Sequence, residues 1–259
     1  MEKSIDSQQT YSMKPRNVFG VGICAWMTLL GPFLGLVLTP AIHAQELLPS
    51  SSPASGGSAA SPATFVSDMM RESCQNLAKG DLDAALDKVN GVINLESQNK
   101  QALLLRGAIY AKQERWDKAD YDYRVALLMD PASSIVKFDM AELNFIQKKY
   151  DDARSGFKEV KGDKELGDFA TYKVLLCDLF GAHEAVASED LEALNQAGGN
   201  PSYYFGNAAW DLVHNKTDDA AAWLKSAAKI YADSPQKFTK YTTCLTNLGY
   251  LPLHLSSAQ

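Results

Sequence analysis

The residue types that most often do chemistry are few and scattered in this sequence. Beyond the apolar amino-terminal segment the histidines are His183, His214 and His254, and none of them lies one helical turn from another histidine or a cysteine. Zinc sites need such spacings. The chain also contains no glycine-rich phosphate loop and no nucleophile elbow. We therefore predict no catalytic residues, no metal site and no cofactor, and a protein that is not an enzyme.

The charged residues exclude one class of partner. The chain has 25 Lys+Arg against 31 Asp+Glu, which gives a formal net charge of −6, and the basic residues form no cluster. Binding to a phosphate backbone requires a basic surface, so we expect no nucleic-acid partner. The acidic set Asp117, Asp120 and Asp122 lies beside Lys118 and Arg124, a pattern typical of a solvated helix face with i, i+4 pairing.

The amino terminus resembles an export signal. Lys14 and Arg16 precede an apolar run, residues 18–38, which is followed by Ala41-Ile42-His43-Ala44. This order predicts a signal peptide, residues 1–44, cleaved after Ala44. The run is also long enough to span a bilayer, so an uncleaved anchor over 18–38 is the alternative. Both predict an exported chain that is periplasmic or secreted, or membrane-anchored facing the same side.

The next segment, residues 45–63, is rich in Ser, Pro and Ala and predicts a disordered linker, because it has little apolar surface to bury. Beyond it, three columns of residues recur with a spacing of 34 residues, and a fifth copy comes 33 residues after the fourth. The columns are Ala85, Ala119, Ala153, Ala187 and Ala220; Val89, Tyr123, Phe157, Leu191 and Leu224; and Val92, Ala126, Val160, Leu194 and Ala227.

Residues 100–131 resemble the tetratricopeptide repeat, a helix–turn–helix unit, in six defining positions. The resemblance implies an all-α solenoid of about five helical hairpins with a C-terminal capping helix: repeats 1–3 in 64–163, degenerate repeats 4–5 and the cap in 164–251, and a tail in 252–259. Leu175 occupies a small-residue column, so we expect the fourth hairpin to splay. The residues predicted to pack the repeats are Gly107, Tyr110, Ala119, Tyr123, Ala126, Pro131, Ala153, Phe157 and Ala220.

The repeat geometry also bears on the cysteines. Cys74, Cys177 and Cys244 fall in repeats 1 and 4 and in the terminal helix, at least two repeats apart in sequence. Packed helices lie about 8–10 Å apart, whereas a disulfide needs Cα atoms within about 4.4–6.8 Å. We therefore predict no intramolecular disulfide.

In tetratricopeptide arrays the first helices of the repeats line a concave groove, so the resemblance implies a binding site there. The corresponding columns in this chain are mostly apolar and aromatic, and they lack the basic and amide side chains of a carboxylate clamp. An apolar groove favours an apolar or amphipathic peptide segment, with Arg71 and Glu142 as polar anchors. The predicted groove residues are Met70, Arg71, Leu104, Phe138, Glu142, Phe145, Ile146, Tyr172, Leu176, Leu179 and Phe205.

Two other interpretations of these columns stay open. The protein can fill the groove itself, through its linker, its terminal helix or a second copy, or the columns can form ordinary core between repeats. The function that we predict is an exported, non-enzymatic interaction scaffold or chaperone-like module for a protein or peptide partner. The alternatives are a membrane-anchored subunit of an envelope or secretion complex, in contact with the membrane only through residues 18–38, and a self-associating structural protein that forms a homo-oligomer.

Overall fold

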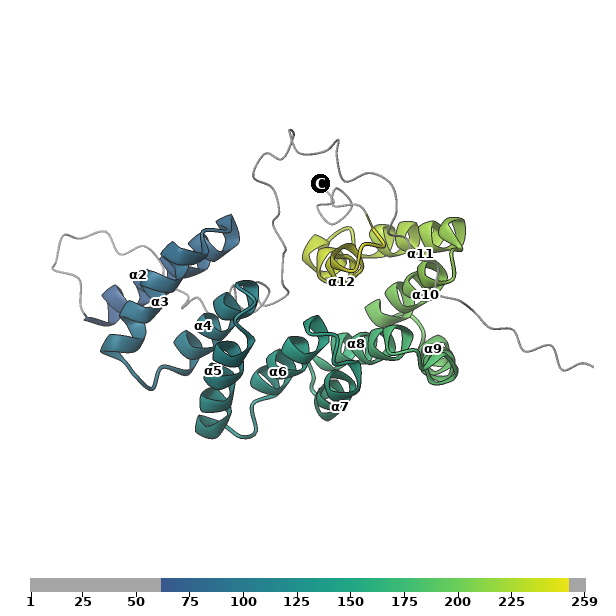
Figure 1. Ribbon diagram of the computed structural model, residues 1–259. Coiled ribbons are helices and arrows are strands. Elements are labelled where there is room, and N and C mark those ends of the chain that lie inside the picture. The colour runs from purple at the N-terminus through teal and green to yellow at the C-terminus, as the bar shows by residue number, and fades with distance from the viewer. Residues whose placement is uncertain (1–61, 252–259) are drawn as a thin grey trace, which may run out of the picture. The chain divides into compact units, whose positions relative to one another are not determined.

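The computed structural model describes residues 62–251, which contain eleven α-helices and no strand (Figure 1). The predicted signal peptide or anchor, residues 45–61 of the linker and the tail lie outside the described residues. The first helix begins inside the segment expected to be linker. The helices are α2 (Pro62–Lys79), α3 (Leu82–Leu95), α4 (Lys100–Lys112), α5 (Trp116–Met129), α6 (Ser134–Ile146), α7 (Tyr150–Val160), α8 (Gly167–Phe180), α9 (Glu184–Ala197), α10 (Pro201–Val213), α11 (Thr217–Ile230) and α12 (Pro235–Asn247).

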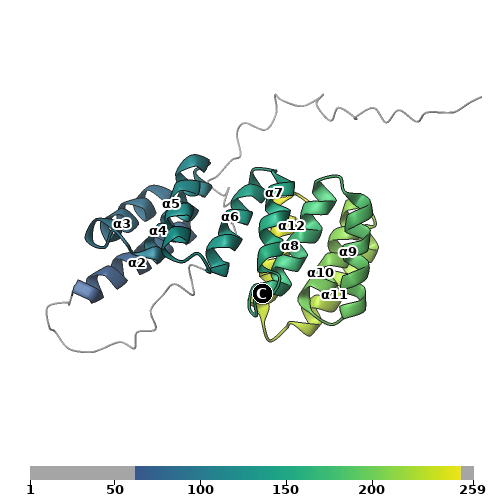
Figure 2. The same cartoon turned by 90° about the horizontal axis from the view of Figure 1, so that it is seen from below.

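The ten helices α2 to α11 pair into five hairpins. Each odd-numbered helix packs on the even-numbered helix before it, and successive hairpins stack through α3 on α4, α5 on α6 and α7 on α8 (Figure 2). Such stacking buries a core that a single hairpin lacks. The predicted all-α solenoid of tetratricopeptide-type hairpins is confirmed.

The turn inside each hairpin recurs with the repeat. The residue with a positive φ is Gly80, Glu114, Lys148, Ala182 and Asn215 in the five successive hairpins. The following residue donates its N–H back to the first helix, as in Arg115 to the Tyr110 carbonyl at 2.9 Å and Lys149 to the Asn144 carbonyl at 2.9 Å. This bonding satisfies carbonyl groups at the helix end. Four hairpins thus accept a left-handed residue other than glycine.

The small-residue columns lie where the two helices of a hairpin approach closely. Ala85, Ala119, Ala153, Ala187 and Ala220 are fully buried. A Cβ added at Gly107 would lie only 2.5 Å from Cε1 of Tyr123. In the fourth hairpin the buried Leu175 takes the place of a small residue, and α8 packs less extensively on α9 than the helices of the other hairpins pack on each other. The predicted splaying of this hairpin is confirmed.

The terminal helix α12 is present where the sequence predicts a cap, but it does not simply extend the stack. It packs on α10 more than on α11, and its side chains reach α8. Figures 1 and 2 show α12 against α8 and α10 on the side away from α7 and α9. This position brings α12 onto the first helices of repeats 4 and 5.

Candidate functional site

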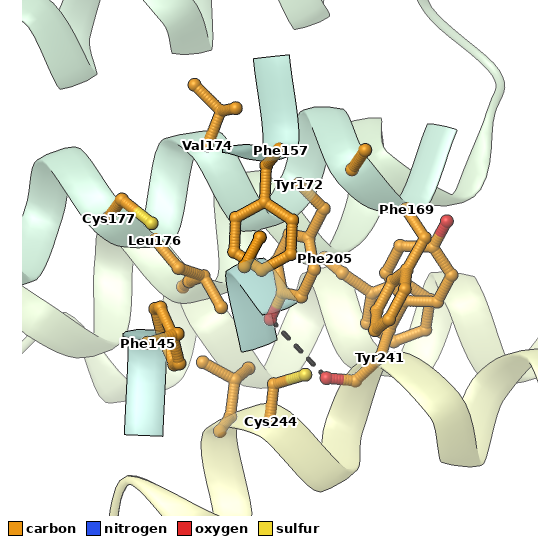
Figure 3. Close-up of a cluster of buried hydrophobic side chains, with 14 of the residues drawn as sticks. Phe145, Phe157, Phe169, Tyr172, Val174, Leu176, Cys177, Phe205, Tyr241 and Cys244 are labelled. Atoms are coloured by element: carbon orange, nitrogen blue, oxygen red, sulfur yellow. Dashed lines mark hydrogen bonds between the residues drawn. The ribbon is translucent and has the colours of Figure 1, made fainter. Parts of the chain in front are cut away.

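The main concentration of aromatic side chains lies between α12 and the first helices α8 and α10. We call it the aromatic groove, and define it by Phe169 and Tyr172 of α8 and Phe205 of α10. Tyr241 of α12 sits among the three, with ring centroids 4.9 Å from Phe169, 5.1 Å from Tyr172 and 4.9 Å from Phe205 (Figure 3). Aromatic pairs at such distances contribute beyond their buried area. Tyr241 is therefore the central anchor of α12.

Further contacts extend along α12 on both sides of this anchor. Phe238, one turn earlier, packs on Phe205 with centroids 5.6 Å apart. The Tyr172 hydroxyl donates to the Tyr241 carbonyl at 3.4 Å, and Lys240 Nζ lies 4.4 Å from the centroid of Phe169. The contact face of α12 also includes the buried Cys244 and Leu245. Apolar residues at this helical spacing form one stripe, and that stripe faces the groove.

One carboxylate holds the amino-terminal ends of α8 and α10 together and also meets α12. Asp168 accepts hydrogen bonds from the Ser202 hydroxyl at 2.6 Å and the Ser202 N–H at 3.2 Å. It also accepts a hydrogen bond from the Tyr241 hydroxyl. Burial, and then the charge of Asp168, raise the pKa of Tyr241 far above its ordinary value. The phenol therefore stays protonated and acts as the donor.

A buried ion pair lies at the other end of the same contact. Lys173 of α8 and Glu142 of α6 are almost fully buried, and Lys173 Nζ lies 2.7 Å from the Glu142 carboxylate. The same ammonium lies 3.7 Å from the centroid of Phe145 and 3.9 Å from Cys244 Sγ of α12. Burial acts to lower the pKa of Lys173, but its neighbours Cys244 and Glu142 outweigh burial and the pKa ends above its ordinary value.

Asp139 lies one turn before Glu142 on α6 and is also buried. Burial, with the charge of Glu142 as the second cause, raises the pKa of Asp139 to about 8. Burial raises the pKa of Tyr123 of α5, and the charge of the nearby Asp139 raises it further. On α6 the chain thus buries Glu142, paired with Lys173, and Asp139, a carboxyl group that holds its proton at neutral pH.

The predicted groove residues fall into two sets. Eight are buried, and these are Met70, Leu104, Phe138, Glu142, Phe145, Tyr172, Leu176 and Phe205. Ile146 and Leu179 are half-buried and Arg71 is exposed. At repeats 3–5 these side chains are covered within the chain, because α12 lies on Tyr172 and Phe205 and because Phe138 and Phe145 pack with Phe157. That they bind a peptide stays a prediction. One of the interpretations left open was that the terminal helix fills the groove. At repeats 4 and 5 the structure has this arrangement.

The polar anchors differ from the predicted ones. Arg71 pairs with Asp68 on its own helix, and Glu142 is engaged by Lys173. Sequence reasoning missed Asp168, Lys173 and Tyr241. The one available signal was Lys173 inside the apolar stretch of α8, because a charge in such a stretch needs a buried partner. Nothing in the repeat columns indicates which residue of α12 meets them.

Cys74, Cys177 and Cys244 form no disulfide in the structure. Cys177 of α8 and Cys244 of α12 both belong to the core cluster that forms where α12 packs against α8. Burial raises the pKa of Cys177 to about 12 and that of Cys244 to about 11. Both therefore remain protonated and unreactive thiols at neutral pH.

The histidines take part in local polar contacts. His183 Nδ1 lies 3.3 Å from Asp178, and His214 Nε2 lies 3.0 Å from Glu184, while His254 is outside the described residues. Within residues 62–251, no group of three or more His, Cys, Asp or Glu side chains gathers as metal ligands would. A cavity of about 350 Å³ lies between α8, α9 and α10, and Asp168 and Ser202 are among its lining residues.

Fold and site together define a tetratricopeptide-type solenoid whose aromatic groove is filled by its own terminal helix. No protein-family model and no curated protein matches the chain. Among solved structures, PilW, a widely conserved type IV pilus biogenesis factor, matches with a TM-score of 0.52 and 16% identity over 74% of this chain and 88% of PilW.

The Pseudomonas aeruginosa protein pilF matches with a TM-score of 0.51 and 15% identity, over 73% of this chain and 87% of its own. The MamA protein matches with a TM-score of 0.46 and 18% identity, over 67% of this chain and 96% of its own. At these identities PilW and pilF share the fold with this chain. Among helices α2 to α12, none is long and apolar enough to cross a membrane.

Proposed function

We propose that this protein is an exported, non-enzymatic interaction scaffold that binds an amphipathic helical segment of a protein partner in its aromatic groove. The observation that carries the proposal is the seating of α12 in that groove. An amphipathic helix already occupies it, with an aromatic anchor among three aromatic side chains. A partner helix with a similar apolar face would find the same contacts.

The composition of the groove supports a helix rather than an extended strand as the ligand. Phe238, Tyr241 and Leu245 lie three and four residues apart and share one face of α12, as in other helix-in-groove complexes. A tyrosine that is buried among aromatic rings, with its hydroxyl paired, has the properties of a binding hot spot. We infer that the partner presents one aromatic residue at the corresponding position.

The absence of catalysis is part of the proposal. The ionisable side chains of the groove act in packing, because Lys173 is paired with Glu142 and Asp168 is engaged by Ser202 and Tyr241. No reactive thiol is available there at neutral pH, since burial raises the pKa of Cys244 to about 11.

The alternative is a membrane-anchored subunit of an envelope or secretion complex. The shared fold with PilW, a type IV pilus biogenesis factor, favours a place in such an assembly. The mass of the protein recovered from cells tests the two forms. Cleavage after Ala44 leaves a chain that begins at Gln45, whereas the anchored form retains residues 18–38. Recovery of the full-length chain in the soluble fraction of the cytoplasm contradicts both.

A photo-crosslinking experiment tests the binding function. A cross-linking amino acid replaces Leu179, which is half-buried against the core cluster that contains the groove residues. In the control it replaces Leu128, which is 81% exposed on α5. We expect a partner polypeptide to be captured from a native envelope extract at position 179 but not at 128, and a synthetic peptide of residues 233–251 to suppress that adduct. Equal adducts at both positions, unaffected by the peptide, contradict the proposal.

A further inference from the structure

The terminal helix behaves in its contacts as a ligand rather than as a cap. Within the carboxy-terminal part of the stack, α10 packs more on α8 than on α9, and α12 in the same way packs more on α10 than on α11. What distinguishes α12 is that Tyr241 and Cys244 also reach past α10 to α8, the first helix of the fourth repeat. It therefore occupies the position that a partner segment takes in a groove.

The contacts also fix the direction of α12. Lys240 meets Phe169, Tyr241 meets Tyr172, and Cys244 meets Lys173. The residue numbers rise together on both helices, so α12 runs roughly parallel to α8 over this contact. The Tyr241 hydroxyl is directed to Asp168 at one end, and the Cys244 thiol lies against the Lys173–Glu142 pair at the other. Two polar contacts of different chemistry therefore define one register and one orientation.

Asp168 distinguishes tyrosine from other aromatic residues at the central position. Its carboxylate is held by Ser202, which is fully buried, and Asn200 also accepts a hydrogen bond from the Ser202 hydroxyl at 3.1 Å. A phenylalanine in place of Tyr241 would fill the same aromatic space but leave the carboxylate without the phenol donor. Hydrogen bonds to charged groups are stronger than those between neutral groups, so the groove favours a hydroxyl at this position.

The connection between α11 and α12 is short, and no disulfide ties the helix down. Residues 231–234 link the two helices, and Cys244 is a free thiol. The groove floor also favours reversible opening. Cys244 of α12 lies 3.9 Å from Lys173 Nζ of the buried Lys173–Glu142 pair, so departure of α12 would open that side of the pair to water. That rehydration offsets part of the apolar area lost.

We propose that α12 is an intramolecular competitor for the groove, and that the groove selects a partner helix with the α12 pattern of an aromatic residue, a tyrosine three residues later and a leucine four residues after that. This inference rests on the proposed function and adds its regulation and its recognition rule. A short tether gives α12 an effective concentration in the millimolar range. A partner helix therefore binds only when its local concentration or its affinity overcomes that of α12.

The test uses the full chain with a specific protease site inserted between Ala232 and Asp233, which leaves every groove residue unchanged. The probe is a fluorescein-labelled peptide of residues 233–251, and fluorescence anisotropy measures its binding before and after cleavage. After cleavage the bound α12 fragment is no longer tethered, so the peptide exchanges into the groove. We expect the apparent affinity to rise about 100-fold on cleavage, because the effective concentration of the tethered helix is lost.

Two peptide variants examine the recognition rule. In the peptide, Tyr241→Phe removes the donor to Asp168, and we expect about tenfold weaker binding to the cleaved protein, as the loss of a hydrogen bond to a charged group predicts. Lys237→Ala changes an exposed residue of α12 and should leave binding unchanged. Equal binding of the Phe variant and the parent peptide overturns the role of Asp168.

Three other results overturn the competitor proposal. The first is no binding of the peptide to the cleaved protein at about 100 µM, a concentration that detects even weak complexes. The second is equal binding before and after cleavage. The third is a dimer of the uncleaved chain in sedimentation that the peptide dissociates, which would assign the groove to α12 of a second copy. If peptide exchange succeeds but photo-crosslinking captures no partner, the proposed function fails, and what stands is that α12 leaves the groove reversibly.

Discussion

The amino-terminal region, residues 62–129, and the carboxy-terminal region, residues 134–247, contain the same kind of hairpin but bury different side chains. In the first region the core around α3 and α4 is aliphatic and includes Val89, Val92, Leu105 and Ile109. The core of the second is aromatic and takes in side chains of α12. The periodic columns therefore specify the hairpins in both regions. The groove contacts of the carboxy-terminal region come from α12, which lies outside the repeat period.

The two regions also differ in how deeply they bury an ion pair. In the amino-terminal region, Lys100 forms an ion pair at 2.7 Å with Asp130, the residue that directly follows this region. Both side chains are partly exposed. The carboxy-terminal region pairs Lys173 with Glu142 at the same 2.7 Å, but with both side chains buried. The two pairs have the same N–O distance and different burial, so they separate the effect of burial from that of distance.

The largest effect that we predict breaks the buried pair. Lys173→Ala leaves the Glu142 carboxylate buried without its partner, which costs about 3–5 kcal/mol of unfolding free energy. Lys100→Ala at the exposed pair should produce a change too small to measure, because exposed pairs contribute little. Urea unfolding followed by circular dichroism measures both. Equal losses in the two variants would show that burial of the Lys173 pair has no energetic consequence.

Two carboxylates should give pH effects of opposite sign. Burial raises the pKa of Asp139 to about 8, so its folded form binds a proton more tightly than its unfolded form. The contribution of Asp139 to stability is present below its unfolded pKa and is lost as the pH rises toward 8, with a slope of up to about 1.4 kcal/mol per pH unit. Asp139→Asn should remove this dependence, measured by urea unfolding from about pH 5, which lies inside the range, to about pH 9, one unit above it.

Asp130 should behave in the opposite way. Its hydrogen bond with Lys100 lowers its pKa, so its contribution is present above the unfolded pKa and is lost as the pH falls through the folded value. Asp130→Asn should therefore change stability only in acid. A loss of stability toward alkaline pH that persists in Asp139→Asn would contradict the assignment to Asp139.

A smaller difference concerns two glycines that face different neighbours. Gly107→Ala places a methyl group 2.5 Å from the ring of the buried Tyr123, and we expect a net loss of about 1 kcal/mol after the helix-propensity gain. In the second region, Gly206→Ala meets the ends of two flexible leucine side chains, at 2.9 and 3.1 Å. There the propensity gain of about 0.5–1 kcal/mol should prevail. Thermal unfolding distinguishes the two, and a stabilising Gly107→Ala would contradict the close approach.

The last prediction concerns the turn inside each hairpin, which both regions share, and here we expect no difference between the two regions. Glu114 and Ala182 adopt positive φ at the same turn of their hairpins. Glycine carries no steric penalty there, so Glu114→Gly and Ala182→Gly should each stabilise by about 1 kcal/mol. Chemical denaturation of each variant measures this. A destabilising result in either region would show that the turn depends on a side-chain contact.

The sequence predicted the features that depend on the period, and it did not predict those that depend on distant packing. The alanine columns, the splayed hairpin at Leu175 and the presence of a terminal helix all result from local pattern and spacing. The docking of that helix depends on the packing of Tyr241 against Phe169, Tyr172 and Phe205, which are distant from it in the sequence. No repeated column encodes this contact, so the groove appeared open and its residues accessible.

The same reasoning accounts for the missed polar residues. Asp168 stands at the first turn of α8, where an acidic residue is ordinarily explained by the helix dipole. Its connection to Ser202 and Tyr241 appears only when α10 and α12 are placed beside α8. Lys173 likewise has a partner on another hairpin, and the separation of the two in sequence conceals the pair.

The most direct test of the filled groove is a nuclear Overhauser experiment on the folded chain with labelled aromatic residues. The Tyr241 ring lies 4.9 Å from both Phe169 and Phe205, centroid to centroid, and we therefore predict cross-peaks from Tyr241 to both rings. The absence of these cross-peaks, together with random-coil shifts for residues 235–247, would contradict the claim that α12 fills the groove.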